Sequence, residues 1–315
     1  MPASPLRLTL RILPAALAVG LGLAASPAVA QPGGRGTPGG PGGAGGPPNG
    51  FALNDVAATY SFSSDSDLER NGKVGSVEVN HFKFEASFAL PAPDTWRLGT
   101  SLFWSRDEFE LTGPVPLPED VEAVGLSFLA TKDLSREIGP GWSAMALVTP
   151  GFASDAGKVN GDSFNLFALA TLGREVSPTF SWSFGVIGRT RADTPVLPVL
   201  GLDWRFAPDW KLTVGFPRTG VAYQFTSRLS LTAGVTVQGG TYHIAKAPAP
   251  GLTDTYLDYR EIRAGVGAAY QITPRLSLVL DGGVTVDRNF DYYDRGVELD
   301  GKSAGFGRLN LRYRF

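Results

Sequence analysis

Apolar and polar residues alternate with a period of two along most of this chain. The alternation begins near residue 55 and is clearest over 229–238, 261–271 and 276–286. A period of two sorts side chains onto the two faces of a β-strand, whereas a helix of 3.6 residues per turn would not sort them. The pattern therefore predicts an all-β fold with one apolar face.

Two architectures produce such strands. A soluble sandwich turns the apolar face inward, while a membrane barrel turns it toward lipid and its polar face toward the lumen. Outside the first 30 residues no window holds the run of about 18 apolar residues that a spanning helix needs. A chain that crosses a membrane without such a helix must do so as a closed barrel, because backbone polar groups in lipid have to be satisfied internally.

The end of the chain favours the membrane barrel. One face of the last segment carries Leu309, Leu311, Tyr313 and Phe315, and the other carries Arg308, Asn310, Arg312 and Arg314. An alternating strand that ends in Phe resembles the assembly signal of bacterial outer-membrane barrels. This resemblance implies a Gram-negative outer membrane, Phe315 as the signal, and the barrel-assembly machinery as a partner during biogenesis.

Aromatic residues gather at the ends of the expected strands. Trp96, Trp142, Trp182 and Trp210 start strands, and Phe206, Phe225, Tyr270 and Phe315 end others. If successive strands alternate in direction, all eight lie at one membrane boundary, where rings with an apolar body and a wet edge are favoured. We expect these residues to form an aromatic girdle.

The connections alternate between tight and long. Short turns at 207–209, 226–228 and 273–275 alternate with longer polar stretches at 64–74, 153–162, 243–258 and 289–302, and only 132–141 departs from the alternation. Short turns belong on the periplasmic side and long loops outside. Both chain termini are then expected in the periplasm, with outer-membrane lipid and lipopolysaccharide around the barrel.

On this basis the sequence predicts a single antiparallel up-and-down barrel of about 14 strands. The expected strands are 55–63, 75–90, 96–111, 121–131, 142–152, 163–174, 179–190, 199–207, 210–217, 220–226, 229–242, 259–272, 276–288 and 303–315. The pair at 210–217 and 220–226 is shorter than the roughly 9–11 residues that a tilted spanning strand needs, which leaves 12 strands as the alternative. Apolar parity also switches near Asn80–Phe82, and this predicts a β-bulge.

The first 50 residues read as an export signal and a leader. Residues 1–30 combine basic residues, a short apolar stretch and the Ala28-Val29-Ala30 motif, which predicts a signal peptide cut near Ala30/Gln31. Residues 31–50 are rich in Gly and Pro and contain nothing to bury, so we expect a disordered leader. The barrel is then expected over residues 51–315.

The stretch from Leu197 to Trp204, followed by Trp210-Lys211-Leu212 and Gly215-Phe216-Pro217, makes a further resemblance. With these residues the whole region 51–315 resembles uncharacterised bacterial outer-membrane β-barrel proteins, often classed as domains of unknown function. The resemblance implies a barrel and implies no catalytic residues.

The sequence offers little catalytic chemistry. The formal net charge of -2 gives no reason to expect a nucleic-acid partner, and the absence of Cys removes disulfides and thiolate chemistry. Two isolated histidines, His81 and His243, match no catalytic or metal-binding motif, and we expect them at an interface or in a loop. We predict no enzyme, cofactor or metal site, with an outer-membrane hydrolase as a distant alternative. The acidic, aromatic stretch 287–294 is expected to be a solvated surface loop rather than a calcium site.

The polar face is the predicted functional surface. Charges facing lipid near the midplane would cost about 2–4 kcal/mol each, so they should face the lumen. The expected lumen-lining residues are Lys83, Glu85, Arg97, Asp203, Arg205, Lys211, Glu261, Arg263, Asp281, Arg308, Arg312 and Arg314. Two functions fit: a polar-lumen channel for small solutes, or a structural or surface-interaction barrel whose interior is blocked by ion pairs.

Overall fold

The computed structural model describes residues 51–155 and 160–315, so the predicted signal peptide and the predicted leader lie outside the described residues. The strands, in chain order, are β1 (Ala52–Glu69), β2 (Lys73–Leu90), β3 (Trp96–Thr112), β4 (Asp120–Asp133), β5 (Trp142–Asp155), β6 (Phe164–Ser177), β7 (Phe180–Arg189), β8 (Val196–Ala207), β9 (Trp210–Val214), β10 (Arg218–Gln224), β11 (Leu229–Ile244), β12 (Thr255–Gln271), β13 (Leu276–Tyr292), β14 (Val297–Gly301) and β15 (Ala304–Arg314). A 3₁₀ turn, η2 (Gly161–Ser163), precedes β6. No helix within these residues is long and apolar enough to cross a membrane.

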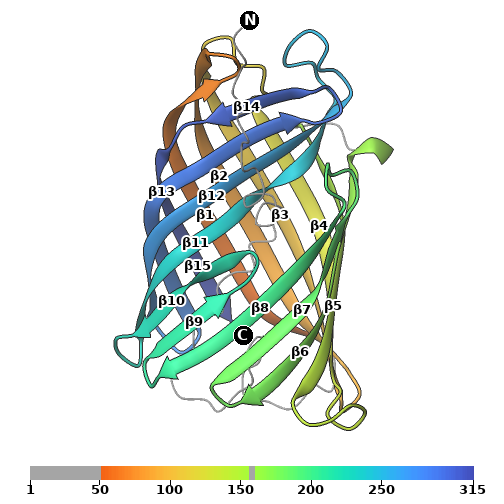
Figure 1. The fold of residues 1–315 in the computed structure, drawn as a ribbon, viewed down its shortest axis with the longest axis vertical. Helices are drawn as coiled ribbons and strands as arrows, with labels where there is room; N and C mark the ends of the chain where they lie inside the picture. The colour runs from red at the N-terminus through yellow and green to blue at the C-terminus, as the bar shows by residue number, and fades with distance from the viewer. Residues whose placement is uncertain (1–50, 156–159) are drawn as a thin grey trace, which may run out of the picture.

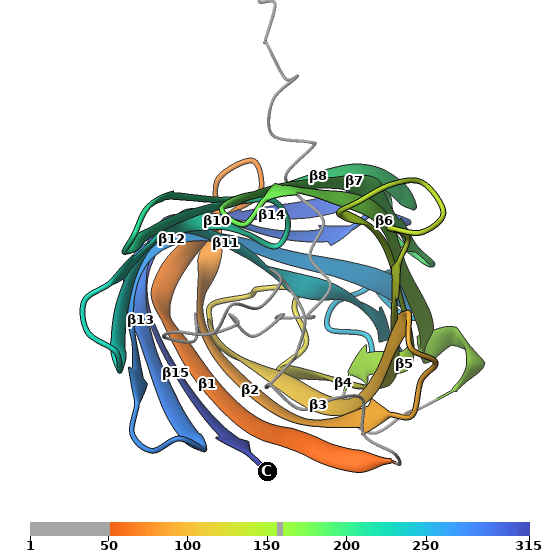
Figure 2. The same ribbon diagram turned by 90° about the horizontal axis from the view of Figure 1, so that it is seen from below.

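The strands form one antiparallel sheet that closes on itself (Figures 1 and 2). The segments β14 and β15 both pair with β13 and β1, so they are two parts of one interrupted strand. The barrel therefore has 14 strands, as predicted. The 12-strand alternative is wrong, because β9 and β10 pair with each other and with separate neighbours on either side.

The first and last strands close the barrel. Nine consecutive residue pairs join β1 to β15, from Asp55 opposite Arg314 to Ser63 opposite Phe306. The Phe315 amide also donates to the Asn54 carbonyl at 3.0 Å. We call the end that carries Asn54 and Phe315 the base, and the opposite end the outer end.

The outside of the barrel carries a belt of large apolar side chains exposed to the surroundings. Phe84, Leu200 and Val266 are 56%, 76% and 66% exposed. Near the base, aromatic rings contact one another, as in the Trp142–Trp182 pair with ring centroids 5.6 Å apart and the Phe206–Trp210 pair at 6.1 Å. A closed barrel with an apolar belt and aromatic rings at its edge suits a lipid bilayer.

Two of the predicted outer loops are mostly strand. Beyond the belt, β1 continues to Glu69 and β2 begins at Lys73. In the same way, β13 continues to Tyr292 and β14 begins at Val297. The predicted loops 64–74 and 289–302 were therefore wrong. Their polar residues face outward above the belt, where water replaces lipid, while their apolar residues face the interior. The stretch 287–294 is likewise no surface loop, since Phe290 and Tyr292 are fully buried.

The predicted bulge at Asn80–Phe82 is also wrong. Here β2 pairs with both neighbours without a shift, and the irregularity lies in β1 between Ser63 and Ser66. The apolar residues of β2 switch between odd and even positions because the side of the strand that must be apolar changes along its length. Phe82 and Phe84 face outward within the belt, whereas Val77 and Val79 face the interior beyond it.

The wall is incomplete where the β9–β10 hairpin is short. On that side, 196–201 of β8 and 238–242 of β11 have no strand partner among the described residues. We call this line between β8 and β11 the seam. At its outer end β11 crosses to β5 and forms a parallel bridge, with His243 opposite Ser154 (Figure 1). The outer part of β11 is buried on both faces.

Candidate functional site

The interior of the barrel is the candidate site. Residues that pair directly across strands share a face, and this register puts the twelve predicted lumen residues on the face that carries the fully buried Glu261. Arg97 and Arg205 near the base are exposed, whereas Arg263 is 2% exposed. That these residues line a path for solutes stays a prediction.

Near the base the interior is open to solvent. The Lys211 Nζ–Asp203 Oδ1 pair, at 2.7 Å, joins side chains that are 36% and 30% exposed although both face inward. Further in, Arg308 makes two bonds to Asp281 Oδ2, at 2.9 and 2.6 Å, and these side chains are 16% and 10% exposed. Solvent access to the interior thus falls with distance from the base.

Midway along the interior, a buried ion network lies on the inner face of the wall. Glu261 accepts from Arg263 Nε at 2.7 Å and from Arg288 Nε at 2.6 Å. From there Arg288 Nη1 reaches Ser66 of β1 at 2.6 Å and Arg288 Nη2 reaches Ser63, while Arg263 Nη1 reaches Ser61 at 3.2 Å. The network thus links β12 and β13 to β1 across the divided last strand that separates them, and its charged side chains are buried.

Beyond the network, an apolar cluster fills the outer end. It consists of Leu68, Val77, Val79, Phe109, Val115, Leu117, Val121, Ala153, Tyr242, Ile244, Leu252, Leu257, Tyr259, Phe290, Tyr292 and Leu299. Tyr259 and Phe290 stack at 4.8 Å, and Phe109 meets both rings edge-on at 5.5 and 5.6 Å. Burying such a side chain contributes about 1.5–3 kcal/mol, so unpacking four of them would cost about 6–12 kcal/mol. We call this cluster the seal.

A hydrogen-bonded link joins opposite walls beside the seal. The Tyr242 hydroxyl of β11 donates to Asp107 Oδ2 of β3 at 2.8 Å, and Asp107 Oδ1 lies 2.8 Å from His81 Nδ1 of β2. His81 therefore faces the interior, where it pairs with a buried carboxylate.

The other histidine lies at the outer end of the seam. His243 is 2% exposed, so the expectation of a loop residue is wrong, and its Nε2 lies 2.8 Å from Asp254 Oδ1. Ligand atoms of His243, Asp254 and Asp162 lie within 4.8 Å of one another, a grouping that the sequence did not suggest. The Arg191 guanidinium lies beside this group, 3.8 Å from Asp162 Oδ1 and hydrogen-bonded to the Tyr256 hydroxyl. These contacts join the turn before β6, the β7–β8 loop and the β11–β12 loop, and we call them the latch.

A second tyrosine strengthens this latch. The Tyr293 hydroxyl donates to the Arg191 carbonyl at 2.5 Å, and its ring stacks on Tyr256 at 6.2 Å. Burial, and next the nearby Asp294 carboxylate, raise the pKa of Tyr293 to about 12. The hydroxyl therefore keeps its proton, and with it this bond, at any physiological pH.

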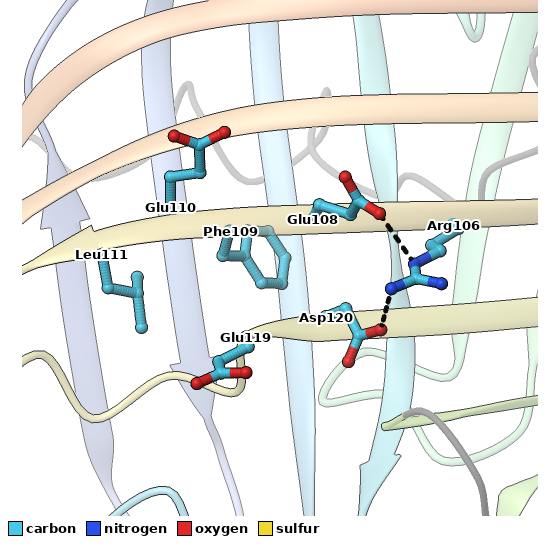
Figure 3. A pocket seen from close by; sticks show the side chains of 7 residues that line it. All are labelled: Arg106, Glu108, Phe109, Glu110, Leu111, Glu119 and Asp120. Carbon is cyan, nitrogen blue, oxygen red and sulfur yellow. Dashed lines mark ion pairs between the residues drawn. The ribbon is translucent and has the colours of Figure 1, made fainter.

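The outer wall carries an acidic hollow of about 400 Å³ on the β3–β4 hairpin (Figure 3). Arg106 is its cation. It lies 2.7 Å from Asp120, 3.1 Å from Glu108 and 3.5 Å from Glu122. The acidic residues of the hollow face the surroundings, while the excess of arginines faces the interior.

Several interior residues were not predicted from the sequence. Arg288, Asp107 and Tyr242 were not among the candidates, although each faces the interior. Strict alternation would have included Asp107, which follows two residues after the inward Ser105. It would have failed for Arg288, because the β12–β13 register shifts between Ile262 and Arg263.

The closed, lipid-belted sheet with a charged interior defines the class of the protein, an outer-membrane β-barrel. Residues 115–299 match the family model described as Domain of unknown function (DUF6268), and the chain belongs to that family. No curated protein matches the chain significantly.

Two solved structures illustrate the likeness of fold. A FadL homologue from Pseudomonas aeruginosa is 13% identical, with a TM-score of 0.47, covering 85% of this chain and 91% of its own. The toluene transporter TodX from P. putida is 10% identical, with a TM-score of 0.49 and the same two coverages.

Proposed function

We propose that this protein is an outer-membrane channel for small solutes, which enter the interior from the base and pass the wall at the seam. The observation that carries the proposal is the contrast along the interior. Charged inward side chains are about one-third exposed at the Lys211–Asp203 pair and fully buried at Glu261. Solvent thus enters the base, and the way straight out is closed by the network and the seal.

The seam is the weakest part of the wall. Elsewhere neighbouring strands are joined by continuous ladders, but along the seam the contacts are few. The Val237 amide donates to Pro217 at 3.0 Å, the Asn165 side chain donates to Thr241 at 2.9 Å, and one bridge joins His243 to Ser154. Just beyond the bridge, Asp155 of β5 accepts from the Ala245 and Lys246 amides at 3.0 and 2.8 Å. Each hydrogen bond contributes about 0.5–1.5 kcal/mol net, so the hydrogen bonding along the seam is weaker than that of a continuous strand ladder.

A reversible disulfide across the β11–β5 bridge tests the proposal. Because the chain has no Cys, the double variant Ser154→Cys/His243→Cys can form only one disulfide, between residues that face each other across the bridge. In planar bilayers the reduced variant should conduct, and oxidation should remove most of the current until a reductant is added.

The matched control is Glu78→Cys/Glu110→Cys. These residues pair directly across β2 and β3, which stay joined along their length, so oxidation should leave the current unchanged. Equal currents in the oxidised and reduced seam variant would exclude the seam as the path. The absence of current from any form would exclude the channel.

A second candidate is a structural barrel with a blocked interior. The hydrogen bond that crosses the interior from Tyr242 to Asp107 favours it, as does the buried network that Arg288 forms with Ser63 and Ser66. This candidate predicts no current in the same recordings, together with normal assembly in the membrane.

A further inference from the structure

A small cavity lies inside the barrel on the base side of the ion network, next to the outer end of β10. It is lined by Arg218, Thr236, Gln238, Arg263, Asp281 and Arg308, among others. Its volume is about 20 Å³. A buried water needs about 10–15 Å³ on this measure, so the cavity has room for one or two oxygen atoms.

The charges around this cavity do not balance. Arg308 is neutralised by Asp281, and Glu261 is shared between Arg263 and Arg288. Arg218 makes no hydrogen bond or ion pair in the part of the chain that the structure describes. Four guanidinium groups thus face two carboxylates, and the immediate surroundings carry two positive charges in excess.

Two of these arginines have donors to spare. Arg263 is 2% exposed and uses its Nε and Nη1 atoms, but its buried Nη2 has no partner. The Phe306 ring lies under this guanidinium at 5.0 Å and holds it in place. A buried donor without an acceptor costs about 1–3 kcal/mol, more when it is charged, so an acceptor at this point would be strongly favoured.

We propose that this cavity binds the carboxylate head group of a small organic anion. A carboxylate has two oxygen atoms, which is what the volume admits, and it matches the fork of donors that a guanidinium presents. Arg263 Nη2 and Arg218 would supply charge-assisted hydrogen bonds, with the polar groups of Thr236 and Gln238 beside them. A phosphate, with four oxygens, needs more room than the cavity offers.

This inference deepens the proposed function, because it names the charge and head group of the solute. Cationic pore linings favour anions. Among the twelve predicted lumen residues eight are basic and four are acidic, although the whole chain carries a formal net charge of -2. These twelve inward residues thus carry an excess of positive charge that the chain as a whole does not.

Equilibrium binding tests the site without requiring transport. Isotope-labelled acetate and its neutral isostere acetamide are titrated into the detergent-solubilised barrel at constant ionic strength, and the broadening of their NMR lines is followed. Acetate should bind saturably and acetamide should not. Losing one charge-assisted bond in Arg218→Gln should weaken acetate binding about tenfold.

Three comparisons make the test decisive. Arg218→Lys restores the charge and should recover part of the affinity. Arg260→Gln, at an outward-facing pair with Asp287, should bind acetate like the unchanged protein. Inorganic phosphate should compete less well than acetate. Equal binding of acetamide, no effect of Arg218→Gln, or stronger competition by phosphate would each overturn the assignment.

The two proposals fail separately. Binding of acetate by a barrel that shows no current would leave the anion site standing and remove the channel. Current through a barrel that binds no acetate below about 100 mM would leave the channel and remove this site.

Discussion

The base and the outer end of the interior are built from the same strands but differ in what fills them. Near the base the inward side chains are small or charged and reach solvent, as the Lys211–Asp203 pair does. Toward the outer end they become a buried ion network and then an aromatic seal. A polar inward face is therefore no measure of an open lumen, because burial and pairing decide whether charge lines a path or blocks it.

The largest effect should come from breaking the ion network. Glu261→Ala leaves Arg263 and Arg288 buried without their counter-ion, and removing one partner of a buried pair costs about 3–5 kcal/mol. The midpoint of urea unfolding in detergent, read by heat-modifiable migration on gels, should fall sharply. An unchanged midpoint would mean that water reaches this level and that the contrast between the two ends is weaker than described.

The next effect concerns the seal. Phe290 is fully buried between Tyr259 and Phe109, so Phe290→Ala should cost about 3 kcal/mol and add current along the barrel axis. Phe84→Ala is the control, since this residue is 56% exposed on the outer belt. If the seal variant conducts no better than the control while remaining folded, another layer closes the outer end.

A smaller effect is expected at the link beside the seal. Tyr242→Phe keeps the ring in the apolar cluster and removes only the donor to Asp107, at a cost of about 1–2 kcal/mol. Unfolding in urea measures it, with Tyr223→Phe at the base as the control. A loss larger than that of Phe290→Ala would show that the link, and not the packing, holds the outer end together.

The smallest effect belongs to the base. Lys211→Gln removes a pair whose members are about one-third exposed, and such pairs contribute less than about 1 kcal/mol. Stability should hardly change, while the preference of the current for anions over cations, measured from reversal potentials in a salt gradient, should fall. A large loss of stability would place this pair in a closed interior.

The parts of the fold that follow from alternation were predictable. Within the lipid belt each strand has an apolar outer and a polar inner face, so the strand count, the closure and the inward parity of Arg308 or Glu261 could be derived from residue order. Beyond the belt the rule reverses. Water lies outside and the seal inside, so polar outer residues such as Asp67 and Glu298 suggested loops where strands continue.

The candidate site was less accessible to prediction, because it depends on contacts across the barrel. Nothing in the sequence near Arg288 indicates that its partners are Ser63 and Ser66, more than 200 positions away. The parallel meeting of β11 with β5 could not be derived from local patterns either. The shortness of 210–217 and 220–226 was the one available signal, and it marked the place where the wall is incomplete.

The crossing of β11 to β5 has a consequence that concerns parity. Going around the outer end, the strands that remain linked are β11 to β13, the divided last strand, and β1 to β5, which is an odd number. A ring of strands that alternate in direction can close without conflict only when their number is even, so an odd ring must contain one contact between strands that run the same way. In this barrel the contact between strands that run the same way is the one between His243 and Ser154. A single such contact cannot spread into a ladder without displacing β6 to β10, and the joint therefore stays one residue long.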